Sequence, residues 1–272
     1  MNRTSASARG RMMAAVALAA AALGGCTGAG AAVPATVTSY GSEIAIGRGT
    51  ARSYITSVGG EPTEIGVVLT EGALDGLPGP HGPGAAHMPD GHTTFEHVLR
   101  LPEGNATPFR HVLVNWNPGG HEPPGIYDKP HFDFHFYVIS DADRRAIDPS
   151  DPEYQRKAER RPAAELIPRN YIMPAPLAFA RMGVHWVDTT SVELKGKPFA
   201  ATFIYGSWDG KLIFAEPMIT KEFLASKPQF SAPLPAPRAG RAAGYYPQGY
   251  RVRWDEAKRE YHITLTGLAS RG

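Results

Sequence analysis

Cysteine is almost absent from this sequence of 272 residues, because Cys26 is the only one. The chain that follows it therefore has no internal disulfide and no zinc or iron–sulfur site built from thiolates. A domain without disulfides depends on its own core for stability. About 230 residues are enough to bury a substantial core unaided.

The sequence also lacks an excess of either charge. It has 28 Lys and Arg residues against 26 Asp and Glu residues, a formal charge of +2. Three of the basic residues, Arg3, Arg9 and Arg11, precede an N-terminal apolar run; without them, 25 basic residues face 26 acidic ones and the net charge becomes −1. Nothing in this balance indicates a nucleic-acid partner.

The N-terminal apolar run, Met12 to Leu23, is too short to cross a bilayer as a helix. Arginines before it and small residues after it give the three-part form of a secretory signal. Leu23-Gly24-Gly25-Cys26 resembles the lipobox of bacterial lipoproteins, which implies cleavage before Cys26 and a diacylglycerol on its thiol. We expect a signal peptide over 1–25, a flexible tether over 26–35 and an extracytoplasmic protein anchored through Cys26 to the envelope membrane. A plain signal peptide with a spare cysteine is the alternative.

Glycine and proline are abundant, with 30 and 25 residues, and they separate short β-type segments. The sequence has no repeat and no change in composition that would mark a second domain. We therefore expect one mainly β domain over 36–272, a barrel or sandwich of roughly eight to ten strands with minor helix. The expected strands are 35–46, 50–58, 65–69, 109–116 and 131–140, with hairpins at 199–218, around an Asp-Gly turn, and at 250–266.

Three other segments have weaker patterns. Residues 141–161 are expected to contain a short helix with solvated charges, residues 170–188 to be partly helical, and the proline-rich residues 227–248 to form an extended connector. Residues 72–97 combine Gly and Pro with several histidines and predict a long surface loop. Its imidazoles would capture metal ions loosely or serve no role, and we expect the main site elsewhere. These histidines are His81, His87, His92 and His97.

Polar and apolar residues alternate in the segment PHFDFHFYVI. Successive side chains of a strand point to opposite faces, so His131, Asp133 and His135 share one face and the phenylalanines share the other. We therefore predict a strand with one buried apolar face and one face that carries ligands or catalytic groups.

A zinc-like ion takes about four ligands in a roughly tetrahedral array. On a regular strand His131 and His135 are about 13 Å apart, which is too far for both to bind one ion. A single site therefore requires a bulge, or an adjacent pair of Asp133 and His135 with His131 at the mouth, or a segment that is not a strand throughout.

Further ligands must come from other parts of the chain. His185 in MGVHW and Glu216 in FAEPM stand among apolar neighbours, and His121 lies in a proline-rich loop. A buried carboxylate needs a metal, a partner or water. The alternatives are a hydrogen-bonded core histidine for His185, and for Glu216 a turn cap or a partner such as Arg181. We predict a divalent, zinc-like ion bound by His131, His135, His185, Glu216 and His121, with Asp133 and Glu216 as the catalytic carboxylates.

The runs GGHEPPGIYDKPHFDFHFY, MGVHW and FIYGSWDGKLIFAEPMIT resemble an uncharacterised family of bacterial and archaeal proteins marked by PHFDFHFY. The similarity extends from about Gly49 to Lys221. It implies a single intact domain and assigns no activity. It also implies that four residues are grouped, without giving them roles: His131, His135, His185 and Glu216.

Two weaker resemblances also concern the metal-binding strand. Five residues separate Gly125 from His131, as in the metal strand of cupins, but Asp133 takes the place of the second histidine and MGVHW is not a full second motif. The cupin ligand geometry is therefore not expected to carry over. FHFY and GVHW also resemble the strand histidines of alpha-class carbonic anhydrases.

Three functions agree with these patterns. The first is a metal-dependent hydrolase or hydro-lyase that uses a metal-bound water, with Asp133 or Glu216 as base. The second is a non-catalytic β-barrel lipoprotein that binds a metal or a small ligand, and the third is a structural, oligomer-forming lipoprotein whose histidines serve packing. An enzyme should leave a coordination position open, whereas a storage or structural site should be closed by four protein ligands.

Overall fold

The computed structural model of this protein describes residues 33–88, 91–174, 177–235 and 244–271. The predicted signal peptide, the lipobox and most of the predicted tether lie outside these residues. The chain divides into two units, Met1–Val33 and Pro34–Gly272, and the second unit holds the sheets. Within the described ranges, no helix is both long enough and apolar enough to cross a membrane.

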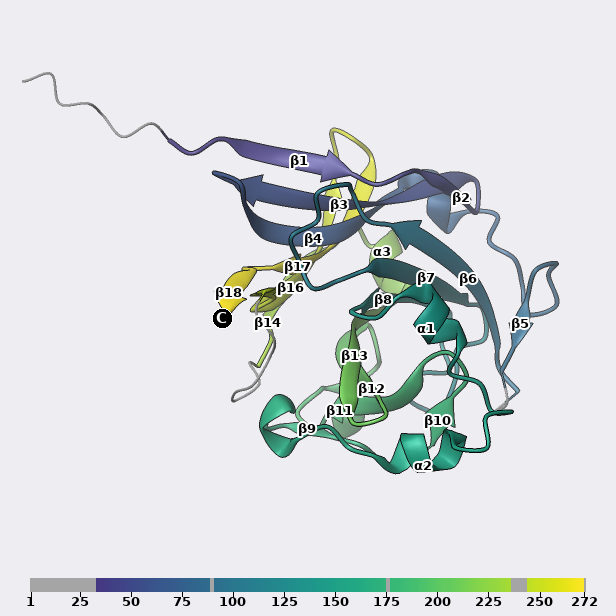
Figure 1. Ribbon diagram of the computed structural model, residues 1–272. Coiled ribbons are helices and arrows are strands. Elements are labelled where there is room, and N and C mark those ends of the chain that lie inside the picture. Colours follow the sequence, from purple (N-terminus) through teal and green to yellow (C-terminus); the bar gives the residue numbers. More distant parts are fainter. Residues whose placement is uncertain (1–32, 89–90, 175–176, 236–243, 272) are drawn as a thin grey trace, which may run out of the picture. The chain divides into compact units, whose positions relative to one another are not determined.

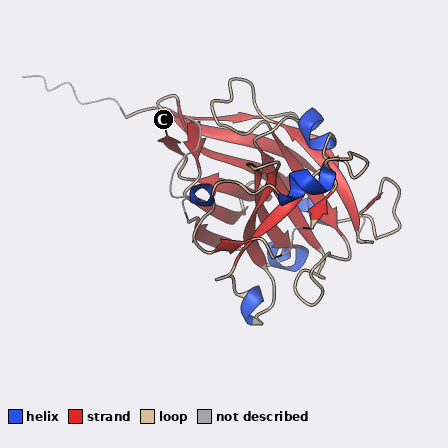
Figure 2. Ribbon diagram, turned by 60° about the horizontal axis from the view of Figure 1, so that its bottom comes forward, coloured by secondary structure: helices blue, strands red, loops and turns tan. Residues whose placement is uncertain are grey.

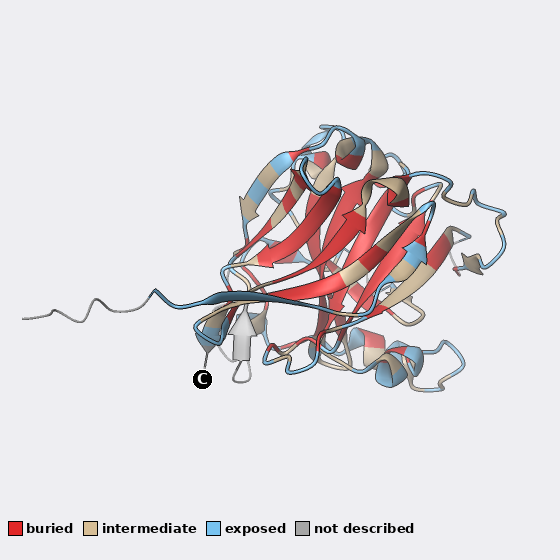
Figure 3. Cartoon of the chain, turned by 90° about the horizontal axis from the view of Figure 1, so that it is seen from above, coloured by how far each residue is buried: buried red, intermediate tan, exposed pale blue. Residues whose placement is uncertain are grey.

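The first sheet contains seven antiparallel strands in the order β1-β3-β4-β17-β16-β14, with β2 beside β3 (Figure 1). Strand β1 is exposed along its length, whereas the central strands are largely buried (Figure 3). The strands are β1 (Thr36–Tyr40), β2 (Ile44–Ile46), β3 (Gly49–Val58), β4 (Glu61–Thr70), β14 (Gln229–Pro233), β16 (Gly249–Asp255) and β17 (Glu260–Thr266).

The second sheet contains nine antiparallel strands in the order β10-β11-β12-β13-β8-β7-β6-β5, with β9 beside β11. The strands are β5 (Ala86–His87), β6 (Thr93–Arg100), β7 (His111–Asn117), β8 (His131–Tyr137), β9 (Tyr171–Ile172), β10 (Ala178–Phe179), β11 (Gly183–Asp188), β12 (Ala201–Trp208) and β13 (Lys211–Thr220). A third, two-stranded sheet pairs β15 (Gly244–Tyr246) with β18 (Ala269–Arg271).

Helices are short and lie at the periphery of the sheets (Figure 2). The α-helices are α1 (Asp141–Arg145), α2 (Tyr154–Glu159) and α3 (Lys221–Ala225), and the 3-10 helices are η1 (Glu71–Leu74), η2 (Ala164–Leu166) and η3 (Glu193–Lys195).

The main core lies between the two large sheets. Its buried cluster combines Ile65 and Val67 of β4 with Phe132, Phe134 and Phe136 of β8, so alternate residues of β8 face the first sheet. Burial of such side chains stabilises the fold by about 25 cal/mol per Å² of apolar surface removed from water. The opposite face of β8 carries His131, Asp133, His135 and Tyr137, as the alternation predicts.

The mainly β prediction is confirmed, and the architecture is a sandwich. Neither large sheet closes on itself, because the first ends at β1 and β14 and the second at β10 and β5. The prediction of eight to ten strands was too low: the described residues form 18. The Asp209-Gly210 turn of the β12–β13 hairpin has φ values of 49° and 78°, the left-handed pair that a two-residue hairpin turn requires.

Five local predictions were wrong. The predicted strand 35–46 is broken between β1 and β2, where a Cβ at Gly41 would collide with the Arg100 carbonyl. The predicted loop 72–97 includes β5 and the start of β6, and the partly helical segment 170–188 contributes β9, β10 and β11. The expected connector 227–248 provides β14, an edge strand that tolerates proline because one side makes no ladder bonds.

The predicted charged helix is two helices, α1 and α2, and Arg144 in α1 is buried rather than solvated.

Acid is expected to destabilise the fold through two buried histidines, His111 of β7 and His262 of β17. Burial lowers the pKa of each imidazole to about 4. Because the pKa in the unfolded chain is about 6.5, the stability that each contributes is present above pH 6.5 and is lost as the pH falls towards 4, on the order of 3 kcal/mol per histidine. Urea unfolding at several pH values should show this loss, and His262→Gln should reduce it. An identical pH dependence in that variant would contradict the assignment.

Candidate metal centre

Side chains with metal-ligand chemistry lie in two groups of three on the face of the second sheet that points away from the core. In each group, one nitrogen or oxygen atom per residue lies within 4.8 Å of the others. Each group combines two imidazoles and one carboxylate. The outer group is His121, His131 and Asp133, and the inner group is His135, His185 and Glu216.

The regular geometry of β8 separates the two groups. The strand pairs with β7 from His131 to Tyr137 and with β13 on its other side, so no bulge brings His131 to His135. Asp133 lies with His131 rather than with His135. The predicted single site is therefore corrected to two groups, because side chains four residues apart on a strand cannot meet at one point.

Three strands of the second sheet position the inner group. His135 is on β8, and Glu216 of β13 follows Ala215, which pairs with Phe136. The Nε2 atom of His135 lies 3.3 Å from Oε2 of Glu216. His185 belongs to β11, the strand beyond β12.

The ring of Phe214 holds the two inner imidazoles in place. Its centroid lies 4.7 Å from that of His135 and 5.6 Å from that of His185. A Cβ at position 206 would collide with this ring, so Gly206, the register partner of His185, leaves room for it.

Without an ion, burial favours the uncharged form of each side chain in the inner group. Burial lowers the pKa of His135 to about 3 and that of His185 to about 4, and both rings are therefore uncharged. Burial, together with the negative charge of Asp133, raises the pKa of Glu216 well above its usual range. A neutral group of this kind is what a desolvated site adopts when no cation balances its carboxylate.

The inner group also has buried polar atoms without hydrogen-bond partners. Both ring nitrogens of His135 and the Oε2 atom of Glu216 make no hydrogen bond, although Nε2 and Oε2 lie close together. Each unsatisfied buried group costs about 1–3 kcal/mol. Two ligands of one tetrahedral zinc ion, with bonds of 2.0–2.1 Å, are about 3.3 Å apart. The spacing of these two atoms therefore suits a shared ion.

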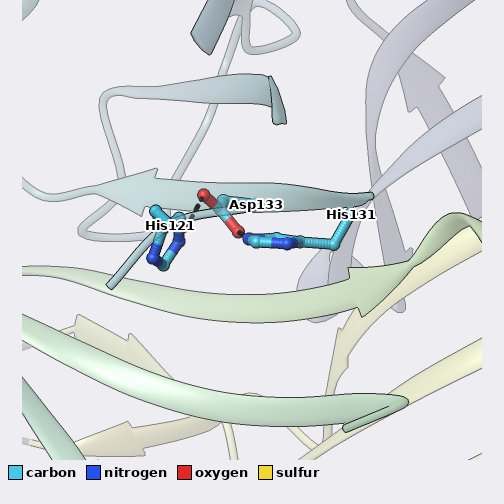
Figure 4. Close-up of side chains that lie close together, drawn as sticks. All are labelled: His121, His131 and Asp133. Carbon is cyan, nitrogen blue, oxygen red and sulfur yellow. Dashed lines mark ion pairs between the residues drawn. The ribbon is translucent and has the colours of Figure 1, made fainter. Parts of the chain in front are cut away.

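The outer group joins the start of β8 to the loop between β7 and β8. In Figure 4 the carboxylate of Asp133 lies between the rings of His121 and His131. Its Oδ1 is 3.1 Å from Nε2 of His131, and its Oδ2 is 3.6 Å from Nε2 of His121. Burial alone would raise the pKa of Asp133, but the two adjacent imidazoles hold it well below its usual range, and the carboxylate is ionised.

Two residues near the outer group were not predicted. Asn117 of β7 pairs with His131 across the strands, and its Nδ2 donates to Oδ2 of Asp133 at 2.6 Å. The alternation of Asn115 and Asn117 in the otherwise mostly apolar strand HVLVNWN was a signal for this polar face. The ring of His92 lies near that of His121, with centroids 5.3 Å apart and planes tilted by 48°. It comes from the histidine-rich segment in which we had expected no main site.

The comparisons with known proteins assign no activity to these groups. Residues 57–116 match the model of the TTHB210-like family, which is described as hypothetical protein TTHB210. No curated protein and no solved structure matches the chain. The matched range ends before the PHFDFHFY motif and contains none of the six residues of the two groups, so the sequence resemblance built on that motif, and the weaker one to cupins, are not supported by this match. The chain is thus similar to this uncharacterised family over about a fifth of its length.

Proposed function

We propose that this protein binds a divalent, zinc-type metal ion in the inner group. The observation that supports this most strongly is the set of buried ligand atoms of His135 and Glu216 that lack hydrogen-bond partners at a spacing that suits one ion. Imidazole and carboxylate are ligands that zinc and similar ions accept, and three of them on paired strands form a preorganised site.

A metal-dependent hydrolase or hydro-lyase is the second candidate function. Three protein ligands leave a fourth position for water, and a bound divalent ion lowers the pKa of such a water to about 7. Asp133 is ionised and shares the face of β8 with His135, so it is the candidate base.

The burial of the inner group favours a metal-binding role over a catalytic one. The side chains of His135 and Glu216 are only 1% and 2% exposed, and His185 is partly buried. A cleft of about 330 Å³ is lined instead by residues such as Arg161, Arg169 and Trp186. A substrate would therefore have to be small and approach past His185.

Metal analysis of the purified protein tests the proposal. After incubation with zinc and removal of the excess, the wild type should retain bound zinc, and His135→Ala should lose the inner equivalent because it removes a central ligand. His81→Ala, at an exposed position in the segment 72–97, is the matched control and should keep the wild-type content. A wild type without metal would favour the structural lipoprotein, in which the histidines serve packing.

We also propose that the protein is held at the bacterial cell envelope by a lipid on Cys26. The lipobox-like Leu23-Gly24-Gly25-Cys26 after an apolar run supports this location. Cys26→Ser should move the protein from the membrane fraction to the soluble extracytoplasmic fraction. A variant that stays in the membrane fraction would rule out this anchor.

A further inference from the structure

The outer group brings the Nε2 atoms of two imidazoles, His121 and His131, close to the carboxylate of Asp133. Nδ1 of His131 lies 2.6 Å from the Lys129 carbonyl oxygen, and Nδ1 of His121 lies 2.8 Å from that of Glu122. A carbonyl only accepts, so each Nδ1 carries the proton and donates it there. In the neutral ring each Nε2 carries the lone pair that a metal ion would bind, and Nε2 of His131 also lies 3.2 Å from Nδ2 of Asn117. A hydrogen bond from a ligand imidazole to a backbone carbonyl is the usual support of a metal-bound histidine.

The carboxylate of the outer group is arranged like a ligand. Oδ1 of Asp133 is buried without a hydrogen-bond donor, although it lies 3.1 Å from Nε2 of His131. The Asn117 amide holds the other oxygen, Oδ2, at 2.6 Å and so fixes the orientation of the carboxylate. A buried carboxylate between two imidazole nitrogens is a site for a cation.

We propose that the outer group binds a second divalent ion, so that the protein carries a pair of neighbouring ions, one in each group. Asp133 and His135 are two residues apart on one face of β8, and the charge of Asp133 acts on His135, His185 and Glu216 of the inner group. The two sites therefore interact electrostatically. This second site goes beyond the proposed function, which requires only the inner group.

The two ions differ in how their ligands are held. All three inner ligands are on strands of the sheet. The outer group takes His121 from the loop between β7 and β8, and that side chain is 19% exposed. A site with one ligand on an exposed loop opens more readily than a site built on paired strands. The outer ion should therefore exchange quickly and the inner ion slowly.

Release of zinc to a chromogenic chelator tests the second site. The full-length protein, loaded with zinc and freed of excess ion, should release two equivalents in two phases whose rates differ at least tenfold. His121→Ala should remove the fast equivalent and keep the slow one. Asp133→Asn, which retains an acceptor oxygen for Asn117, should do the same if the alanine variant fails to fold. The matched control, His81→Ala, should keep both phases.

The outcomes separate the two proposals. One slow equivalent in the wild type, retained in His121→Ala, would overturn the second site and leave the inner site intact. Two equivalents that both persist in His121→Ala and Asp133→Asn would also overturn the outer ligand set. Loss of the fast equivalent in His81→Ala would show loose capture by exposed imidazoles and count against the outer site. No bound zinc in the wild type would remove the inner site as well.

Discussion

Removal of bound metal is expected to lower the free energy of unfolding by about 4 kcal/mol, relative to protein kept with free ion at about a thousand times its dissociation constant. The ion binds only the folded chain, because its inner ligands come from β8, β11 and β13 and are far apart in sequence. For a domain of this size, such a loss corresponds to a fall of roughly 8–16 °C in the melting temperature.

Thermal unfolding with zinc and with a chelator measures this effect, and Glu216→Gln provides its control. Because burial raises the pKa of Glu216 and so favours its neutral carboxyl without metal, a neutral glutamine of the same shape should leave the metal-free stability close to that of the wild type. It should nevertheless remove most of the stabilisation by zinc. A zinc-induced shift of equal size in this variant would mean that the ion acts elsewhere.

Loss of the Arg144 guanidinium is expected to have the next largest effect, about 3 kcal/mol of folding stability in Arg144→Ala. The side chain is 0% exposed and its donors reach Glu96 and Asp141, while its guanidinium lies over the ring of Tyr137. Truncation removes one cationic partner from each carboxylate and opens a cavity beside β8. We place the cost at the low end for a buried ion pair, because Arg181 still contacts Glu96 at 3.0 Å.

The neighbouring Arg145 is a matched control for this substitution. It also binds Asp141, but its side chain is 54% exposed, and an exposed ion pair contributes only about 0–1 kcal/mol. Urea unfolding of the two alanine variants should therefore separate them clearly. If Arg144→Ala were as stable as Arg145→Ala, the buried ion cluster would not support the fold as we describe.

Local sequence patterns predicted those features that depend on one strand or one turn. The alternation in residues 131–137 fixed which side chains of β8 face the core, since a strand has a period of two residues. The Asp209-Gly210 pair predicted its hairpin because few residues adopt positive φ without strain. By contrast, β9 and β10 are two residues long and carry too little pattern to be recognised.

The division of the ligands into two groups could not be predicted from the sequence. It depends on the register of β13 against β8, which places Glu216 beside His135, and on the addition of β11 beyond β12, which brings in His185. Both are pairings between distant segments. Alternation on β8 places His131 and His135 equally near Asp133 in sequence, and no spacing within the strand indicated that Asp133 would lie against His131 and the loop residue His121.

Anomalous diffraction at the zinc absorption edge, from crystals of the zinc-loaded protein, tests the inner site most directly. The result we predict is a peak about 2.0–2.2 Å from Nε2 of His135, from a nitrogen of His185 and from an oxygen of Glu216. A map without a peak between these residues, with the Glu216 carboxyl hydrogen-bonded directly to His135, would contradict metal binding at this site.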